Sequence, residues 1–249
     1  MRNRRVSTSS RDQETRFAPG DLVREFGRRM GWNLVKCNVM FEGTTDVSYC
    51  NVANRLYFES TGKNLIDNDF QVMAIGERDQ GGTDGIRDRL RTLQDVLRSD
   101  PSVLGMSVVC VVDDDHEGRK AFADLRKKFQ PWRDLFKLNR VFPRTPISRS
   151  SEHFEGELKK ANANWDGLDC DIEDLIADEI IEYFISENPR CLKAEVEEKG
   201  GRFHRKFHGH EKPKLVRFVE QHASLSDLNQ IVEILKSLRW LLRLDSEGS

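Results

Sequence analysis

The sequence has no long apolar run, no paired cysteine spacing and almost no excess of charge of either sign. No apolar stretch is long enough to cross a membrane, and the first residues lack the apolar segment of a signal peptide. The 249 residues include 40 Lys and Arg against 42 Asp and Glu, so the net charge of −2 neither favours nor excludes a nucleic-acid partner. We therefore expect a cytoplasmic protein with no membrane contact.

The cysteines and histidines do not form a recognisable metal or disulfide pattern. The five cysteines are scattered and odd in number, which is typical of reduced thiols in a cytoplasmic protein. His204, His208 and His210 are irregularly spaced and have no cysteine close by, which disfavours a zinc site. No GxxxxGK[ST] segment occurs, so we do not expect this chain to hydrolyse ATP on its own.

Three consecutive aspartates follow a short apolar run. Residues 108–112 are five β-formers in a row, which predicts a strand covered on both faces, and Asp113, Asp114 and Asp115 come next. Because strand side chains alternate, Asp113 and Asp115 are expected on one side and Asp114 on the other. Two carboxylates at the end of a buried strand suit Mg²⁺ or Mn²⁺. The alternative, a helix N-cap with first-turn acids, requires only one or two of them.

A second carboxylate follows another expected strand. Residues 33–41 read as a strand, Glu42 and Gly43 come directly after it, and a helix is expected to follow over residues 46–60. Asp46 falls in the first turn of that helix, where ordinary capping explains it well. Capping does not explain a Glu-Gly pair at the end of an apolar strand.

The remaining pattern alternates strands and helices, which predicts a layered α/β fold with a parallel sheet. A turn containing Gly81 and Gly82 opens a helix, where either a phosphate-binding loop or an ordinary turn is consistent with the sequence. The other expected segments are a flexible tail (1–18), strands (70–75 and 138–142), an irregular stretch (143–170) and two helices (170–186 and 225–244).

Basic residues are concentrated between residues 199 and 217. Phe203 and Phe207 lie among them, and Glu211 is the single acid in the segment. Such a segment is either a phosphate-contacting surface or a solvated loop. The basic residues are Lys199, Arg202, Arg205, Lys206, Lys212, Lys214 and Arg217.

The two acidic motifs, in this order, resemble the TOPRIM domain of topoisomerases, bacterial primases and several nucleases. The resemblance covers about residues 33–145 and rests on Glu42-Gly43 and on the DxDxxG motif that runs from Asp113 to Gly118. It implies a Rossmann-like parallel sheet flanked by helices, within a core over residues 19–145, and a mainly helical extension over residues 146–249. It also implies that Glu42 acts as a catalytic acid/base or metal-linked group, that Asp113 and Asp115 bind Mg²⁺ or Mn²⁺, and that Asp46 supports them in catalysis.

Departures from other TOPRIM branches favour the nuclease branch. Tyr49, Tyr57 and Tyr183 fall in expected core helices, so no free tyrosine is apparent for a topoisomerase, and a primase zinc module is absent from the sequence. The chain resembles the overcoming-lysogenization-defect nucleases and the TOPRIM effectors of PARIS-type anti-phage systems. That branch implies a further metal-linked Glu, matched loosely by Glu173, and a catalytic Lys, matched by Lys212 or Lys214.

We therefore expect a metal-dependent endonuclease that hydrolyses phosphodiester bonds in RNA, with tRNA among the candidates, or in DNA. The resemblance implies a toxic anti-phage effector, with an ATPase partner subunit and a homodimer as expected assemblies. A ribosomal-RNA maturase and an inactive TOPRIM module that binds nucleic acid or a partner protein remain alternatives. The expected nucleic-acid contacts are Arg202, Arg205, Lys206, Lys212 and Lys214.

Overall fold

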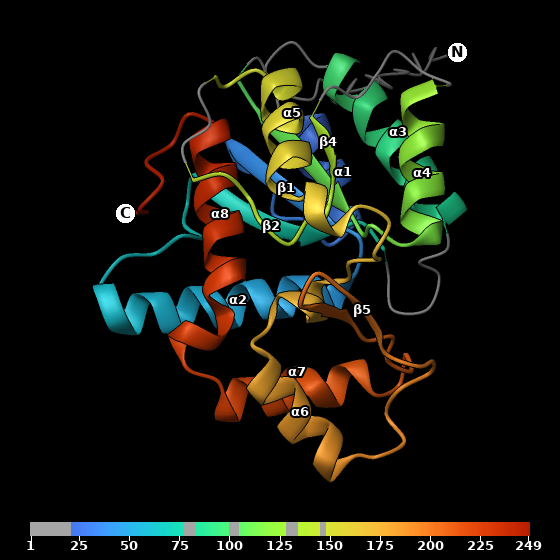
Figure 1. Cartoon of the computed structure of the whole chain (residues 1–249). Helices are drawn as coiled ribbons and strands as arrows, with labels where there is room; N and C mark the ends of the chain where they lie inside the picture. Colours follow the sequence, from blue (N-terminus) through green and yellow to red (C-terminus); the bar gives the residue numbers. More distant parts are fainter. Residues whose placement is uncertain (1–20, 77–82, 100–104, 128–133, 145–147) are drawn as a thin grey trace, which may run out of the picture.

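A computed structural model of the chain describes residues 21–76, 83–99, 105–127, 134–144 and 148–249. Its centre is a four-stranded sheet in the order β2-β1-β3-β4, in which every neighbouring pair is parallel (Figure 1). The expected tail (1–18) and the Gly81-Gly82 turn lie outside the described residues. The strands of this sheet are β1 (Cys37–Phe41), β2 (Phe70–Ala74), β3 (Ser107–Val112) and β4 (Leu135–Lys137).

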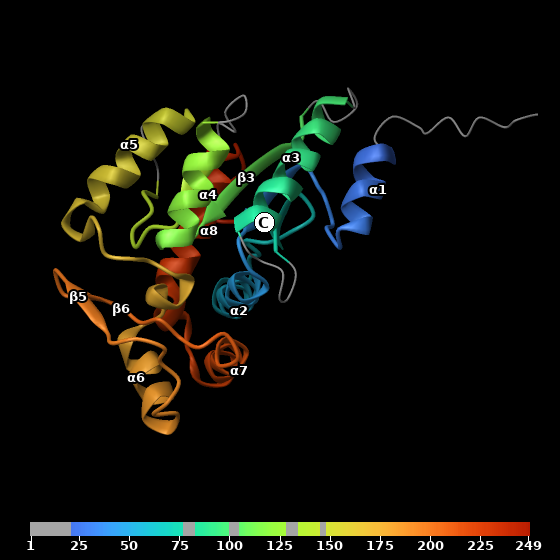
Figure 2. The same cartoon turned by 90° about the vertical axis from the view of Figure 1, so that its right-hand side faces the viewer.

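Helices cover both faces of the sheet, as alternating side chains of β1 and β3 require. Val39 and Val109 face one apolar cluster, whereas Met40 and Cys110 face the other. Figure 2 shows α1 and α3 on one side of the strands and α5 and α8 on the other. The bounds are α1 (Asp21–Arg29), α2 (Thr44–Thr61), α3 (Thr83–Ser99), α4 (His116–Lys127), α5 (Ser151–Ala161) and α8 (Asn229–Leu241).

The C-terminal half adds a lower layer beneath α2 (Figure 1). One apolar cluster joins this layer to the sheet, because it contains Val111 of β3 together with Phe184 and Leu215 of the lower helices. None of the described helices is both long and apolar enough to cross a membrane. Besides α5 and α8, the elements of this half are the 3₁₀ turns η2 (Ala163–Trp165), η3 (Ile172–Leu175) and η4 (Leu225–Leu228), helices α6 (Asp178–Glu187) and α7 (Lys212–His222), and the hairpin β5 (Glu197–Lys199) and β6 (Arg202–His204).

The predicted fold class is confirmed: a Rossmann-like parallel sheet is flanked by helices and followed by a mainly helical C-terminal region. The strand expected at residues 138–142 is wrong, because β4 ends at Lys137 and only the Leu138 amide continues the ladder, donating to the carbonyl of Val112 at 2.7 Å. Leu138 and Phe142 are buried, but in an irregular segment. Their apolar character therefore reflects packing rather than strand pairing.

Two helical expectations are also corrected. The stretch expected to be irregular contains α5, which begins after Ser150, whose hydroxyl accepts a hydrogen bond from the His153 amide, and which buries only Phe154 and Leu158. The helix expected over residues 170–186 is two elements, η3 and α6, separated by extended backbone at Ile176. The C-terminal helix likewise divides into η4 and α8. Tyr183 is not a core residue, since 46% of it is exposed.

Candidate active site

The carboxyl ends of β1 and β3 meet at the point where the strand order reverses. From β1, the chain crosses through α2 to β2 on one side, whereas β3 and β4 lie on the other side of β1. In open parallel sheets, ligands bind in the crevice at such a switch point. Glu42 directly follows β1, and Asp113 directly follows β3. The sheet topology therefore brings together the two motifs that the sequence analysis singled out.

Glu42 and Asp46 are held by the turn between β1 and α2. The Glu42 carboxylate accepts a long hydrogen bond of 3.4 Å from the Asp113 amide, which links the two strand ends directly. Asp46 is buried and accepts a 2.8 Å hydrogen bond from the Gly43 amide. Asp46 thus caps the first turn of α2, as the capping alternative predicts, while its charge also reaches Glu42 and Asp113.

Asp113 and Asp115 point toward this site, and the turn after them is fixed by Gly118. Asp115 Oδ1 accepts a 2.8 Å hydrogen bond from the Gly118 amide, and Lys206 Nζ lies 3.4 Å from Asp115 Oδ2. A β-carbon at Gly118 would lie 2.0 Å from the Asp113 carbonyl oxygen. Only glycine fits this close approach, so the DxDxxG spacing has a steric cause here.

The third side of the site comes from η3 and α7. Lys212 Nζ, at the start of α7, lies 3.1 Å from Glu173 Oε2 and 3.5 Å from Asp171 Oδ2. Asp171 and Glu173 are buried, and Asp171 Oδ1 and Glu173 Oε1 have no hydrogen-bond partner within the described part of the chain. We call the six carboxylates of this site the acidic cluster: Glu42, Asp46, Asp113, Asp115, Asp171 and Glu173.

A buried ion network positions η3 below the acidic cluster. Asp174 Oδ2 lies 2.7 Å from His204 Nδ1, and Asp174 Oδ1 accepts a 3.1 Å hydrogen bond from the Arg205 amide. Asp174 Oδ2 also accepts the Asp171 amide at 3.0 Å, and Arg140 Nη2 lies 3.6 Å away. Because β6 and η3 are joined through Asp174, the hairpin fixes the direction in which Asp171 and Glu173 point.

Burial and mutual repulsion raise the pKa of most carboxyl groups in the acidic cluster. Burial raises the pKa of Glu42 to about 7, and the charges of Asp46 and Asp115 add to this effect. Burial, with the charge of Glu173, raises the pKa of Asp46 to about 6. Burial also raises the pKa of Asp113 well above its usual value, and the charge of Asp46 adds most to this effect.

Two groups differ from this pattern. Burial raises the pKa of Asp115, but the Gly118 amide and Lys206 outweigh it and bring that pKa below its usual value. For Lys212, burial lowers the pKa, but the carboxylates of Glu173 and Asp171 outweigh burial and raise it well above its usual value. Lys212 is therefore a fixed positive charge inside the acidic cluster.

The five expected nucleic-acid contacts do not share one surface. Lys212 pairs with Glu173 of the acidic cluster, and Lys206 pairs with Asp115 of the same cluster. Arg205 is buried and pairs with Asp178 at 2.6 Å, whereas Lys214 is exposed and pairs with Glu211 at 2.8 Å. Arg202 stands over the indole of Trp165, 5.7 Å from its centroid. The basic segment therefore divides between the site, the core and two separate parts of the surface.

Asp171 belongs to the site but was not predicted from the sequence. The sequence signal for Asp171 is the alternation of acids at Asp169, Asp171 and Glu173 before an apolar stretch. A spacing of two residues indicates extended backbone and not one face of a helix. The predicted Glu173 does lie among the carboxylates, and of the two predicted lysines Lys212 lies there while Lys214 does not.

As they stand, no three His, Cys, Asp or Glu side chains of the described residues form a ready metal-binding group. Lys212 instead supplies the positive charge between η3 and the strand ends. The donors are nonetheless suited to a hard cation, because they are all carboxylate oxygens and two of them are buried without a partner. No protein-family model, curated protein or solved structure matched the chain.

Proposed function

We propose that the chain is a metal-dependent nuclease of the TOPRIM type that hydrolyses phosphodiester bonds in RNA or DNA. The observation that carries the proposal is the acidic cluster itself, six carboxylates gathered at the switch point of a parallel sheet around one partly buried lysine, Lys212. Bringing so many like charges together away from water lowers the stability of the fold unless a cation binds to them and neutralises them. This arrangement therefore favours a functional role over a structural one.

Mg²⁺ or Mn²⁺ would be held by Glu42, Asp113 and Asp115, with Glu173 and Asp171 opposite them. Asp171 Oδ1 and Glu173 Oε1 support this fit, since both are buried acceptors without a donor among the described residues. When bound, the cation supplies Lewis-acid chemistry that stabilises the charge developing on a phosphate. The raised pKa values of Glu42 and Asp113 also support cation binding. The carboxylates repel one another, and a bound divalent cation would offset that repulsion.

The residues of the chain have separate tasks in this proposal. Glu42, which follows β1 and accepts a hydrogen bond from the Asp113 amide, is the carboxylate that we assign to accept a proton from water. Lys212 holds Asp171 and Glu173 in place and offers a cation to the phosphate, while Lys206 does the same at the outer edge of the site. Asp46 keeps the start of α2 in register with Glu42 through the Gly43 amide.

A second function, binding without cleavage, is favoured by one observation. Lys212 already neutralises part of the acidic cluster, as a permanent counter-charge would in a module that binds a partner protein or nucleic acid. The ribosomal-RNA maturase alternative would use the same active site as the proposed nuclease and would differ from it only in substrate.

The experiment that separates cleavage from binding is the Asp113→Ala variant, assayed with Mg²⁺ or Mn²⁺ on single-stranded and structured RNA and on DNA. We expect cleavage to be lost and metal-free stability to rise, because a repelling carboxyl is removed. The matched control is Asp69→Ala, an exposed carboxylate at the opposite edge of the sheet, just before β2. Equal cleavage by wild type and Asp113→Ala, or binding with no cleavage by either, would rule out the nuclease function.

The cellular role we propose is that of a toxic effector in anti-phage defence, acting in the cytoplasm and restrained by an ATPase partner subunit, with a homodimer as its assembly. The absence of a GxxxxGK[ST] segment supports a separate ATPase. We expect expression of the wild type alone to halt growth, and the Glu42→Ala variant, at equal soluble yield, to be harmless. Equal toxicity of the two proteins would assign the harm to binding or aggregation.

A further inference from the structure

A second hollow lies next to the acidic cluster, between β4, α4 and α5. It encloses about 400 Å³, a size within the usual range of small-ligand pockets. Phe122, Phe136, Leu158 and Leu168 form apolar parts of its wall, and polar side chains line about as much of it. None of these residues belongs to the acidic cluster, so the nuclease proposal gives this hollow no role.

Polar and charged side chains make up the other half of the lining of this hollow. Lys137 Nζ lies 3.0 Å from both carboxylate oxygens of Asp114, so a fixed donor and acceptor stand together at one end. Asn139 donates to the Lys137 carbonyl at 2.7 Å, and its side-chain oxygen accepts no hydrogen bond from the described residues. Lys159, at the rim, is exposed and has no acidic partner in the described ranges.

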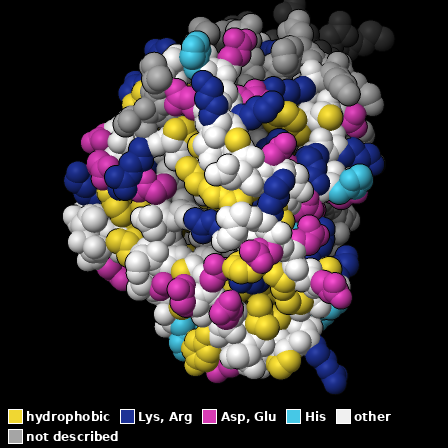
Figure 3. Space-filling view, in the orientation of Figure 1, with side chains coloured by type: hydrophobic (Ala, Val, Ile, Leu, Met, Phe, Trp, Pro, Cys, Tyr) yellow, Lys and Arg dark blue, Asp and Glu magenta, His cyan; other side chains and the backbone are white. Residues whose placement is uncertain are grey.

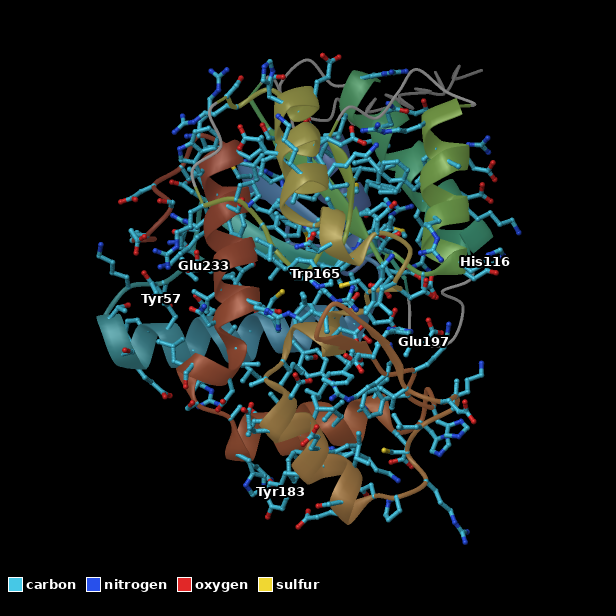
Figure 4. All side chains as sticks on the ribbon, viewed as in Figure 1. Tyr57, His116, Trp165, Tyr183, Glu197 and Glu233 are labelled. Carbon is cyan, nitrogen blue, oxygen red and sulfur yellow. The ribbon has the colours of Figure 1, made fainter. Side chains whose placement is uncertain are left out.

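Trp165 is the aromatic residue at the mouth of the hollow. It lies between the end of α5 and the β5-β6 hairpin (Figure 4), where its indole nitrogen donates to the Gly200 carbonyl at 3.3 Å. The Arg202 guanidinium lies over the ring, 5.7 Å from its centroid. The indole is therefore held at a partly exposed position, which is how proteins present an aromatic ring for stacking.

The hollow and the acidic cluster share a wall. The backbones of Asp114 and Cys170 exchange two hydrogen bonds, of 3.0 and 3.3 Å, and both residues line the hollow. Their neighbours in the sequence, Asp113, Asp115 and Asp171, belong to the acidic cluster. Around this part of the surface, Lys and Arg side chains are mixed with acidic and apolar ones (Figure 3). A nucleic-acid strand that placed one phosphate at the acidic cluster would thus place a neighbouring base beside the hollow.

We propose that this hollow binds a single nucleobase, which stacks on Trp165 and meets Asn139 and the Asp114–Lys137 pair with its polar edge. A base is planar and apolar on its faces but carries donors and acceptors on its edge, which matches a hollow lined by both aromatic or aliphatic and polar side chains. Lys159 at the rim is placed for the phosphate of the same nucleotide. The inference rests on the proposed function in taking the base from a substrate strand; a free nucleotide is the other source of the same chemistry.

The test is binding measured by fluorescence anisotropy in EDTA, so that no cleavage occurs. The probes are a 12-nucleotide single-stranded RNA of mixed sequence, an abasic strand of the same length, and AMP and UMP as competitors. We expect Trp165→Ala to weaken RNA binding about tenfold, within the range for one stacked base, and to leave abasic binding unchanged. Trp165→Phe should restore most of the affinity, because a ring remains.

Two further variants guard against a folding artefact. Ala163→Leu places a bulky side chain at the exposed rim of the hollow and should mimic Trp165→Ala. Trp240→Ala is the matched control, since Trp240 is also partly exposed and also carries an arginine, Arg149, over its ring, but lies on α8 away from the hollow. It should bind RNA as the wild type does.

The outcomes separate this inference from the proposed nuclease function. Equal effects of Trp165→Ala on base-bearing and abasic strands, or no effect on either, would overturn the base pocket even where Mg²⁺-dependent cleavage is intact. Base-selective binding without cleavage by the wild type would refute the nuclease and leave the pocket standing. Loss of AMP or UMP binding in Trp165→Ala, with strand binding unchanged, would assign the hollow to a free nucleotide.

Discussion

Replacing Glu42 by Gln should remove a large part of the pH dependence of stability in the metal-free protein. Burial and the charges of Asp46 and Asp115 raise the Glu42 pKa from its ordinary value of 4.5 to about 7. The folded protein therefore keeps a proton on Glu42 over a pH range in which the unfolded chain has released it. The free energy of unfolding is then highest below pH 4.5 and falls as the pH rises toward 7.

The magnitude follows from the size of the shift. Raising the pKa of Glu42 from 4.5 to about 7 corresponds to about 3 kcal/mol, at about 1.4 kcal/mol per pKa unit. Glutamine has a similar shape and cannot ionise, so the Glu42→Gln variant should lack this share of the loss. Asp46 and Asp113, whose pKa values are also raised, retain a pH dependence of the same sign in both proteins.

The assay is urea unfolding at pH 5 and pH 8, in EDTA, for wild type and Glu42→Gln. We expect the wild type to lose about 2.5 kcal/mol more than the variant between the two pH values, somewhat less than the full shift, because the unfolded chain has already released most of the Glu42 proton at pH 5. Repeating the wild-type series with Mg²⁺ should reduce the loss, because a bound cation favours the ionised carboxylates. Parallel behaviour of the two proteins in EDTA would refute the argument that Glu42 is held in a charge-repelling environment.

Three other changes test parts of the same region. Lys212→Met should lower the metal-free unfolding free energy by about 3–5 kcal/mol at pH 8, because Glu173 and Asp171 lose their partner. Urea titrations should report a smaller loss at pH 5. Gly118→Ala should destabilise the protein and reduce any cleavage. Its control is Gly156→Ala, within α5 and with nothing near its β-carbon, which should stabilise the protein by about 1 kcal/mol in the same titrations. Equal effects of the two substitutions would contradict the steric argument for Gly118. Lys206→Gln should lower the log–log salt slope of RNA binding by about one, as one lost phosphate contact requires, and an unchanged slope would remove Lys206 from the interface.

The fold could be predicted because the strands that determine it have strong local patterns. The apolar run before Asp113 and the one before Glu42 are both buried central strands, which need no long-range information to be recognised. The weaker strand β4 was misplaced, since three residues give too short a pattern to separate Leu135–Lys137 from the buried but irregular Leu138.

The candidate site was only partly predictable, for a different reason. Glu42 and Asp113 follow strands, so their convergence follows from parallel topology once the strands are known. Asp171 and Lys212 come from turns and helix starts whose position depends on how η3 and α7 pack under the sheet. The extended backbone at Ile176 separates η3 from α6, whereas the local sequence there predicts a continuous helix.

The order in which the acidic cluster is assembled has a consequence for synthesis on the ribosome. All six carboxylates precede Lys212 in the chain, and Asp113 leads it by about 100 residues, or about 5–20 s of translation at typical rates. During that interval the nascent chain has the acidic strand ends without the lysine that neutralises them in the finished fold. The carboxyls must therefore remain hydrated or protonated, and the edge of the sheet closes only when α7 emerges. A nuclease built this way would gain its complete active site late in its own translation.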